Sequence, residues 1–129
     1  MGEYLSNRAL NKTIRKVENL FAVSLAKPIW SRRELESNLE WFLTWKIKQA
    51  TKPDTFWCDG AKDLHLERLS NKFLQIKATI RIGPESDVSC INEATLYGTL
   101  SLSSHGKRLK SYNLVIEEGE STYVLSKKT

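Results

Sequence analysis

The residues that could bind a metal or catalyse a reaction lie between positions 58 and 67. They are Cys58, Asp63, His65 and Glu67. Asp63, His65 and Glu67 alternate with other residues, and alternate side chains of an extended strand point to one face. Two carboxylates and an imidazole on one face are a donor set for a metal ion or for proton transfer.

The same pattern is more typical of the solvated face of an edge strand. Side chains two residues apart on a straight strand are separated by about 6.6 Å, which is awkward for binding one ion. The second histidine, His105, falls in an expected turn, and no sequence around Cys58 is diagnostic of a nucleophile. A small enzyme or metal protein using Cys58, Asp63, His65 and Glu67 is an alternative, but we expect no catalytic residue, metal or cofactor.

Apolar periodicity indicates the elements that would position these residues. Apolar residues occupy every second position from Leu74 to Ile82, which predicts a strand with one buried and one wet face. Further strands are expected over residues 63–70, 92–103, 109–117 and 122–126. Residues 51–62 are predicted to form a loop, and His105-Gly106 is predicted to form a two-residue hairpin turn.

Two amphipathic helices are predicted before the strands, over residues 4–25 and 31–50. In the first, apolar residues recur every three or four positions from Leu10 to Phe21. The second begins at Ser31, which is followed three residues later by a glutamate and so forms a capping box. Pro28 separates the two helices, because the residue before a proline avoids helical geometry.

This order of elements predicts an α+β fold, with both helices packed on one face of a four- to five-stranded antiparallel meander sheet. The 129 residues are expected to form a single domain, 1–129, with helices at about 4–25 and 31–50 and a sheet at about 63–126. Gly98 lies in mid-strand on the inward face, where glycine marks a bulge, a bend or a close approach. A bend there would curve the sheet into a cone, similar in layout to the cystatin-like and nuclear-transport-factor-like folds, with an apolar pocket.

Aromatic residues are concentrated between positions 30 and 57. Aromatic side chains fill cores, but they also anchor interfaces and line ligand pockets. The favoured hypothesis is therefore a small non-enzymatic interaction protein that binds a protein partner, a second copy of itself or a small ligand. The residues expected at this surface or pocket are Trp41, Trp45, Lys46, Phe56, Trp57, Tyr97 and Gly98.

Positive charge is concentrated in the first half of the chain. Residues 1–50 contain nine lysines or arginines and five acidic residues, and the whole chain has a formal net charge of +5. Basic residues on one helical face can contact phosphates, and basic residues beside an aromatic on a sheet face can bind single strands. The alternative of nucleic-acid binding would use Arg8, Lys12, Arg15 and Lys16 of the first helix together with Lys77 and Arg81 of the sheet.

Cysteine content and hydropathy suggest where the protein acts. The chain has two cysteines, Cys58 and Cys90, which we expect to be reduced. No apolar run approaches the ~20 residues needed to span a bilayer, and the first residues lack the apolar core of a secretory signal. We therefore expect a cytoplasmic protein without a membrane span.

Overall fold

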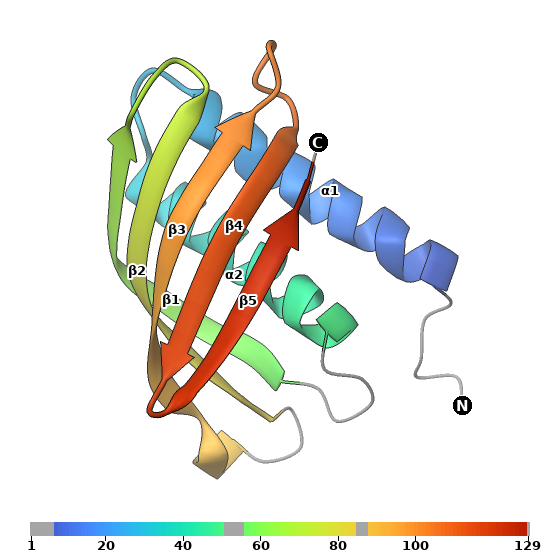
Figure 1. Cartoon of the computed structure of the whole chain (residues 1–129), viewed down its shortest axis with the longest axis vertical. Helices are drawn as coiled ribbons and strands as arrows, with labels where there is room; N and C mark the ends of the chain where they lie inside the picture. The colour runs from blue at the N-terminus through green and yellow to red at the C-terminus, as the bar shows by residue number, and fades with distance from the viewer. Residues whose placement is uncertain (1–6, 51–55, 85–87, 129) are drawn as a thin grey trace.

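The computed structural model describes residues 7–50, 56–84 and 88–128 (Figure 1). Its elements in chain order are α1 (Asn7–Ala26), α2 (Arg32–Ala50), β1 (Phe56–Arg68), β2 (Phe73–Pro84), the short 3-10 helix η1 (Val88–Cys90), β3 (Asn92–Leu102), β4 (Leu109–Glu118) and β5 (Ser121–Lys127). The strands pair antiparallel in the order β1-β2-β3-β4-β5, and the sheet remains unclosed. The α+β class and the meander are confirmed.

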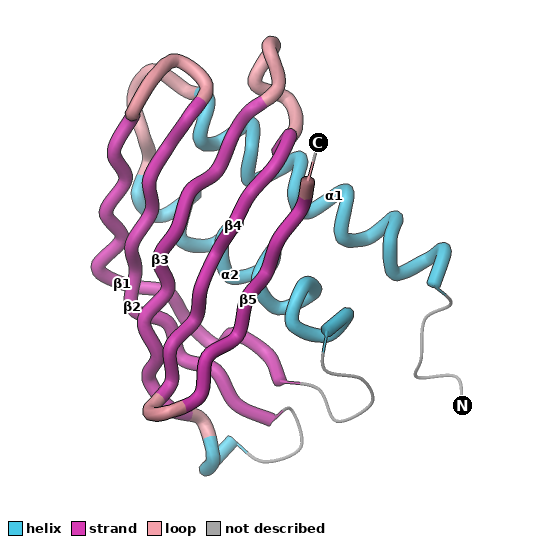
Figure 2. The backbone as a smooth tube through the Cα atoms, viewed as in Figure 1, coloured by secondary structure: helices cyan, strands magenta, loops and turns pink. Residues whose placement is uncertain are grey.

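Both helices cover one face of the sheet, and the other face is left uncovered (Figure 2). The helices form an antiparallel pair that is joined by polar contacts along its whole length. The Lys27 ammonium donates to the Glu34 carboxylate (2.9 Å), and the side-chain amide of Asn38 donates to the Leu20 carbonyl (3.3 Å). The side-chain amide of Gln49 donates to the side-chain oxygen of Asn11 (3.1 Å). These contacts fix which residues of α1 lie level with which residues of α2.

The start of α2 is capped as the sequence predicts. The Ser31 carbonyl accepts a hydrogen bond from the Leu35 amide (3.0 Å), and the Ser31 hydroxyl accepts one from the Glu34 amide (3.4 Å). The second half of the capping box differs, because the Glu34 carboxylate binds Lys27 instead of reaching back to the cap. The glutamate thereby ties the end of α1 to the start of α2.

β1 is longer than predicted, since it begins at Phe56. The predicted loop over residues 51–62 is therefore wrong from Phe56 onward, and residues 51–55 lie outside the described part of the chain. The Asp59-Gly60 pair is a bulge in the strand and not a turn, and a second irregularity follows at Asp63, whose φ is 52°. Pairing with β2 along both sides of these bulges overrides the local turn preference.

The connection between β3 and β4 is also longer than predicted, so the two-residue turn at His105-Gly106 is wrong. The loop spans residues 103–108, and its shape depends on Ser103. The Ser103 carbonyl accepts a hydrogen bond from the Gly106 amide (2.9 Å), while its hydroxyl accepts from the amides of Lys107 (3.3 Å) and Arg108 (3.2 Å). One serine thus satisfies three backbone donors and stabilises a wider loop.

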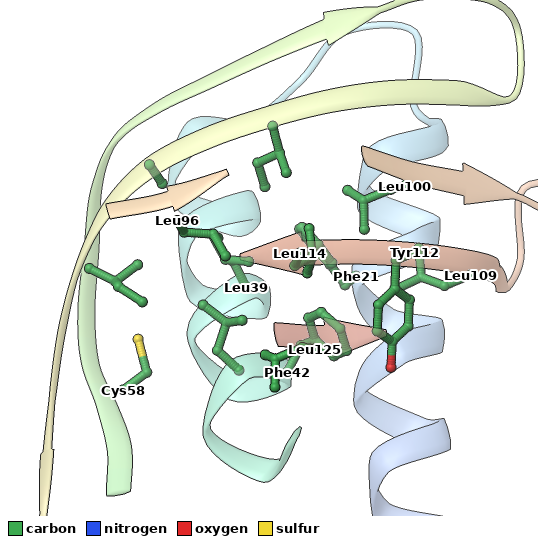
Figure 3. Close-up of a cluster of buried hydrophobic side chains, with 14 of the residues drawn as sticks. Phe21, Leu39, Phe42, Cys58, Leu96, Leu100, Leu109, Tyr112, Leu114 and Leu125 are labelled. Carbon is green, nitrogen blue, oxygen red and sulfur yellow. The ribbon is translucent and has the colours of Figure 1, made fainter. Parts of the chain in front are cut away.

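The core fills the space between the helices and the sheet (Figure 3). Phe21 of α1 stacks on Phe42 of α2 with ring centroids 5.8 Å apart, and Phe42 meets Tyr112 of β4 edge-on at 5.2 Å. Leu96 and Leu114 contribute fully buried side chains from the sheet. The inward positions of the strands are those that the alternation predicts.

Gly98 marks a close approach between two strands, which is one of the three alternatives that the sequence left open. Its φ is 154°, and a Cβ atom placed there would lie 2.1 Å from the Asn113 carbonyl oxygen of β4. The register places Gly98 between Ile76 and Leu114. The packing of the strands is therefore sufficient to explain the glycine.

Candidate protein-binding surface on the helix layer

The structure separates Cys58 from the other three residues of the catalytic alternative. Cys58 is buried and its amide donates to the Thr44 hydroxyl (3.2 Å), whereas Asp63, His65 and Glu67 are exposed. Burial raises the pKa of the Cys58 thiol to about 12, so it carries almost no thiolate at neutral pH. Within the described residues, no group of three or more His, Cys, Asp or Glu side chains is placed to hold a metal ion.

The outer face of the sheet carries Lys77, Arg81 and Tyr97, and its polar groups bind one another. Tyr97 donates a hydrogen bond to the Glu117 carboxylate, which raises the pKa of the tyrosine. Arg81 lies 3.6 Å from Asp59. Lys77 lies opposite Tyr97 in the register. One tyrosine engaged by a carboxylate is a poor stacking platform for bases.

A buried polar cluster joins α1 to the sheet. Glu18 of α1 is 3% exposed, and its carboxylate accepts hydrogen bonds from the Tyr112 hydroxyl (2.6 Å) and the Lys127 ammonium (3.0 Å). The Lys46 ammonium lies 5.5 Å from the centroid of the Tyr112 ring. Glu18, Lys46, Tyr112 and Lys127 are called the Glu18 cluster below.

Burial sets the protonation states in the Glu18 cluster. It raises the pKa of Tyr112, and the hydrogen bond to Glu18 raises it further, so the tyrosine remains a neutral donor. Burial lowers the pKa of Lys46, while the nearby Glu18 opposes that change and Lys127 reinforces it. Since Glu18, Tyr112 and Lys127 satisfy one another, the cluster acts chiefly as a polar anchor for α1.

This anchor was not predicted from the sequence, although one signal was present. Glu18 follows Ile14 by four residues and precedes Phe21 by three, so it lies within the apolar stripe of α1. A charged residue in such a stripe must find a partner when it is buried. The partners, Tyr112 and Lys127, are more than ninety residues away and cannot be identified from periodicity.

The anchor leaves the opposite face of α1 exposed to solvent, and this face is basic. Arg8, Lys12, Arg15 and Lys16 are all exposed. None of them forms an ion pair with another residue of the described ranges. Glu18 is the one acidic residue within α1, and it is buried on the other side. The exposed face of α1 therefore carries four positive charges and no negative charge.

Apolar side chains lie beside these charges. Leu20 and Val23 of α1 are 51% and 45% exposed, and Trp41 of α2 is 58% exposed. The contacts between the helices place Leu20 level with the stretch from Asn38 to Trp41. Trp45, one turn further along α2, is half-buried.

A shallow hollow connects the charges with the apolar residues. It runs along α1 and is lined by Lys12, Arg15, Lys16, Leu20 and Val23, among others. With Trp41 across the helix pair, these residues form a surface that we call the helix-layer surface: Lys12, Arg15, Lys16, Leu20, Val23 and Trp41. Such a surface combines an exposed apolar patch with a basic border.

The residues predicted for a partner surface are divided between two layers. Trp41 and Trp45 lie on α2, where Trp41 belongs to the helix-layer surface. Lys46 turns inward to the Glu18 cluster, while Tyr97 and Gly98 belong to the sheet. The structure therefore does not bring these five residues together.

The other residues predicted for the partner surface and for nucleic-acid binding also do not come together in one site. Phe56 and Trp57 begin β1, but their side chains lie outside the described part of the structure. Lys77 and Arg81 of the nucleic-acid alternative lie on the uncovered sheet face, away from the basic face of α1. Leu20 and Val23 are surface residues that were not predicted from the sequence, because they resemble ordinary core positions of an amphipathic helix.

Comparison of the chain with protein-family models, with curated proteins and with solved structures gave no match. No helix in the described residues is long and apolar enough to cross a membrane.

Proposed function

We propose that this chain is a non-enzymatic interaction protein whose helix-layer surface binds an acidic amphipathic helix of another protein. The observation that carries the proposal is the position of two half-exposed apolar side chains, Leu20 and Val23, next to basic residues without an ion-pair partner in the described chain, with the exposed Trp41 on the adjacent helix.

The apolar part of the surface suits a helix. Leu20 and Trp41 lie at about the same level of the antiparallel helix pair, because the side-chain amide of Asn38, which precedes Trp41 by three residues on α2, donates to the Leu20 carbonyl, and both side chains are exposed. An amphipathic helix can place its apolar face on such a helix pair, with side chains at three- and four-residue spacing as anchors. Tryptophan is the residue type most enriched among the anchors that dominate binding energy.

The charge of the surface favours an acidic partner over a second copy of the chain. In a two-fold symmetric contact each subunit offers the same surface, so the basic faces of the two α1 helices would be brought together. Like charges placed opposite each other at an interface cost several kcal/mol. Glutamates and aspartates on a partner helix would instead pair with Lys12, Arg15 and Lys16.

Nucleic acid is a weaker match for the same residues. Its bases bind to aromatic faces, whereas Leu20 and Val23 are aliphatic. The basic residues of α1 and those at Lys77 and Arg81 lie on opposite outer faces, so one short strand does not reach both sets.

The test is calorimetric titration of the protein with a designed amphipathic peptide about as long as α1. Leucines follow helical three- and four-residue spacing and glutamates fill the other positions. We expect saturable binding that weakens at high salt. The double variant Leu20→Ser/Trp41→Ala should weaken it by at least about tenfold, and the triple reversal Lys12→Glu/Arg15→Glu/Lys16→Glu should abolish it.

Matched controls come from the uncovered sheet face. Val124→Ser removes an equally exposed apolar side chain, and Lys77→Glu reverses an exposed charge; both variants should bind the peptide as the parent protein does. Equal binding of a peptide with lysines in place of glutamates contradicts the proposal. So does a homodimer in light scattering that Trp41→Ala dissociates, or tight oligonucleotide binding that the α1 charge reversals abolish while the acidic peptide does not bind.

A further inference from the structure

Three loops meet at one end of the sheet, at the top of Figure 1, and they are fastened to one another. They are residues 27–33, which join the helices and include the first two residues of α2, residues 68–72, which include the last residue of β1 and the β1–β2 connection, and the β3–β4 connection at 103–108. We call this region the loop end. The Arg68 guanidinium donates to the Lys27 carbonyl (2.7 Å) and lies 4.2 Å from the centroid of the Trp30 ring. Arg68 therefore holds the first two segments in direct contact.

The third segment contacts the first two. A Cβ atom at Gly106, whose φ is 69°, would lie 2.6 Å from the Ala26 side chain, so this loop rests against the end of α1. The Leu102 amide also donates to the Lys72 carbonyl (2.8 Å), which joins the β3–β4 connection to the β1–β2 connection. The loop end is thus a preformed surface and not three independent loops.

The loop end is strongly basic. Its three segments contain seven lysines and arginines and no aspartate or glutamate: Lys27, Arg32, Arg33, Arg68, Lys72, Lys107 and Arg108. Only Lys27 among them is neutralised within the described chain, by Glu34. The opposite end of the sheet has the reverse charge, because Glu117 and Glu118 end β4 and Glu120 lies in the β4–β5 turn.

A hollow of about 320 Å³ opens between the loop tips. Its lining includes the basic side chains Arg68, Lys72 and His105 and the hydroxyl-bearing Ser103 and Ser104, with no acidic residue. Guanidinium, ammonium and hydroxyl groups are the donors that bind phosphate oxygens. The hollow is therefore suited to one phosphate group of a larger ligand.

Two aliphatic side chains protrude at the same end. Ile29 is 86% exposed and Leu69 is 54% exposed, each within one of the basic loops. Aliphatic side chains do not stack on nucleic-acid bases, but they do insert among lipid acyl chains next to a basic surface. We infer that the loop end docks on the surface of a bilayer that contains anionic phospholipids, with Ile29 and Leu69 inserted and a lipid phosphate bound in the hollow.

The charge distribution orients this contact. Each lysine or arginine near an anionic leaflet contributes attraction that falls off within a Debye length. The acidic β4–β5 turn lies at the far end of the sheet, where it is not repelled by the membrane. The helix-layer surface lies on the side of the molecule, so docking at the loop end leaves it accessible to a protein partner.

The test is co-sedimentation of the full chain with vesicles of phosphatidylcholine and phosphatidylserine in a two-to-one ratio, compared with phosphatidylcholine alone. We expect binding to the anionic vesicles and at least about tenfold weaker binding to the neutral ones. The double variant Lys72→Ala/Lys107→Ala should reduce affinity for the anionic vesicles about thirtyfold. Ile29→Ser/Leu69→Ser should reduce it about tenfold or more.

Two control variants match these changes elsewhere on the chain. Lys12→Ala/Lys16→Ala removes the same charge from the helix-layer surface, and Val124→Ser removes an exposed aliphatic side chain from the sheet; both should bind vesicles as the parent protein does. All seven substituted positions in these four variants are exposed, and circular dichroism checks that each variant is folded. Equal loss for test and control charge variants overturns the inference, because binding would then follow net charge alone. Binding of single-stranded RNA or a soluble headgroup without vesicle binding also overturns it. The acidic-peptide titration is independent of this outcome.

Discussion

The two outer faces of the molecule differ in how their charges are satisfied. On the sheet face, Lys62 pairs with Glu93 (3.0 Å) and Arg81 lies 3.6 Å from Asp59. On the helix face, Lys12, Arg15 and Lys16 have no such partner among the described residues. The sheet brings these opposite charges together, on the neighbouring strands β1 and β2 for Asp59 and Arg81, and across β2 from β1 to β3 for Lys62 and Glu93. In contrast, α1 places like charges three and four residues apart.

This difference distinguishes the sheet face, whose charges are paired within the fold, from the helix face, where a partner can bind. The ion pairs between strands let Lys62 and Arg81 remain exposed without a partner from another molecule. The helix face retains unpaired charge and exposed apolar area, both of which a partner can satisfy. The same contrast predicts how substitutions in each region affect stability.

The largest effect is expected from Gly98→Ala, which disturbs the layer that supports both faces. The new Cβ would meet the Asn113 carbonyl oxygen at 2.1 Å, so β3 and β4 must move apart. We expect a loss of roughly 3 to 5 kcal/mol in the free energy of unfolding, measured by urea denaturation. Gly60→Ala is the matched control, since a Cβ atom placed at that position has no other atom within 4 Å. A similar loss for both would show that the contact with Asn113 does not cause the effect, since alanine by itself restricts the unfolded chain and favours folding.

The next effect is expected from Glu18→Gln, which weakens the anchor of α1. Removing the carboxylate leaves Lys127 without its partner, but that side chain is 37% exposed and regains water. We expect a loss of about 2 kcal/mol, below the value for a fully buried pair. A cycle with Lys127→Met measures the coupling between the two side chains. If Glu18→Gln and Lys127→Met change the free energy of unfolding additively, the two side chains do not interact and the proposed anchor is wrong.

High pH should destabilise the protein through two buried groups. Burial raises the pKa of Tyr112 and of Cys58, the latter to about 12. A group with a raised folded pKa contributes stability that is fully present below its unfolded pKa and lost as pH rises toward the folded value. We therefore expect stability to fall from about pH 9 upward, by about 1.4 kcal/mol per pH unit for each group that titrates only in the unfolded chain.

The control for the alkaline effect is the variant Tyr112→Phe. It should unfold more easily at neutral pH, because Glu18 loses a donor, yet its stability should depend less steeply on pH above about 10. Thermal melts at a series of pH values check both points. An unchanged slope in this variant would assign the alkaline loss to other groups.

The smallest effects should have opposite signs on the two faces. Lys16→Glu relieves repulsion with Lys12 four residues earlier and should raise stability by about 0.3 kcal/mol. Lys62→Glu places a second carboxylate beside Glu93 and should lower stability by about 0.5 kcal/mol. Both differences should shrink in high salt. If denaturant melts show that both variants change the free energy of unfolding in the same direction, the two faces do not differ in how their charges affect stability.

Periodicity in the sequence was enough to predict the architecture. Strict alternation from Leu74 to Ile82 and the stripe from Leu10 to Phe21 assign each segment to strand or helix, because burial repeats every two residues in one and every three to four in the other. Ser31 marked the start of α2, since a capping residue depends on local backbone geometry, whereas at Gly98 the sequence left a bulge, a bend and a close approach open. The fold class and the meander order followed from these local signals.

The surfaces were decided by tertiary structure. Which exposed residues become neighbours depends on how α1 and α2 pair and on which loops meet at one end of the sheet, and neither is set by local spacing. The anchor between Glu18 and Lys127 joins residues more than a hundred positions apart. The sequence alone therefore determined the inward positions of the strands, because burial there repeats every two residues. The fold decided that Glu18 is buried, that Leu20 and Val23 are exposed, and which exposed charges and apolar groups share a surface.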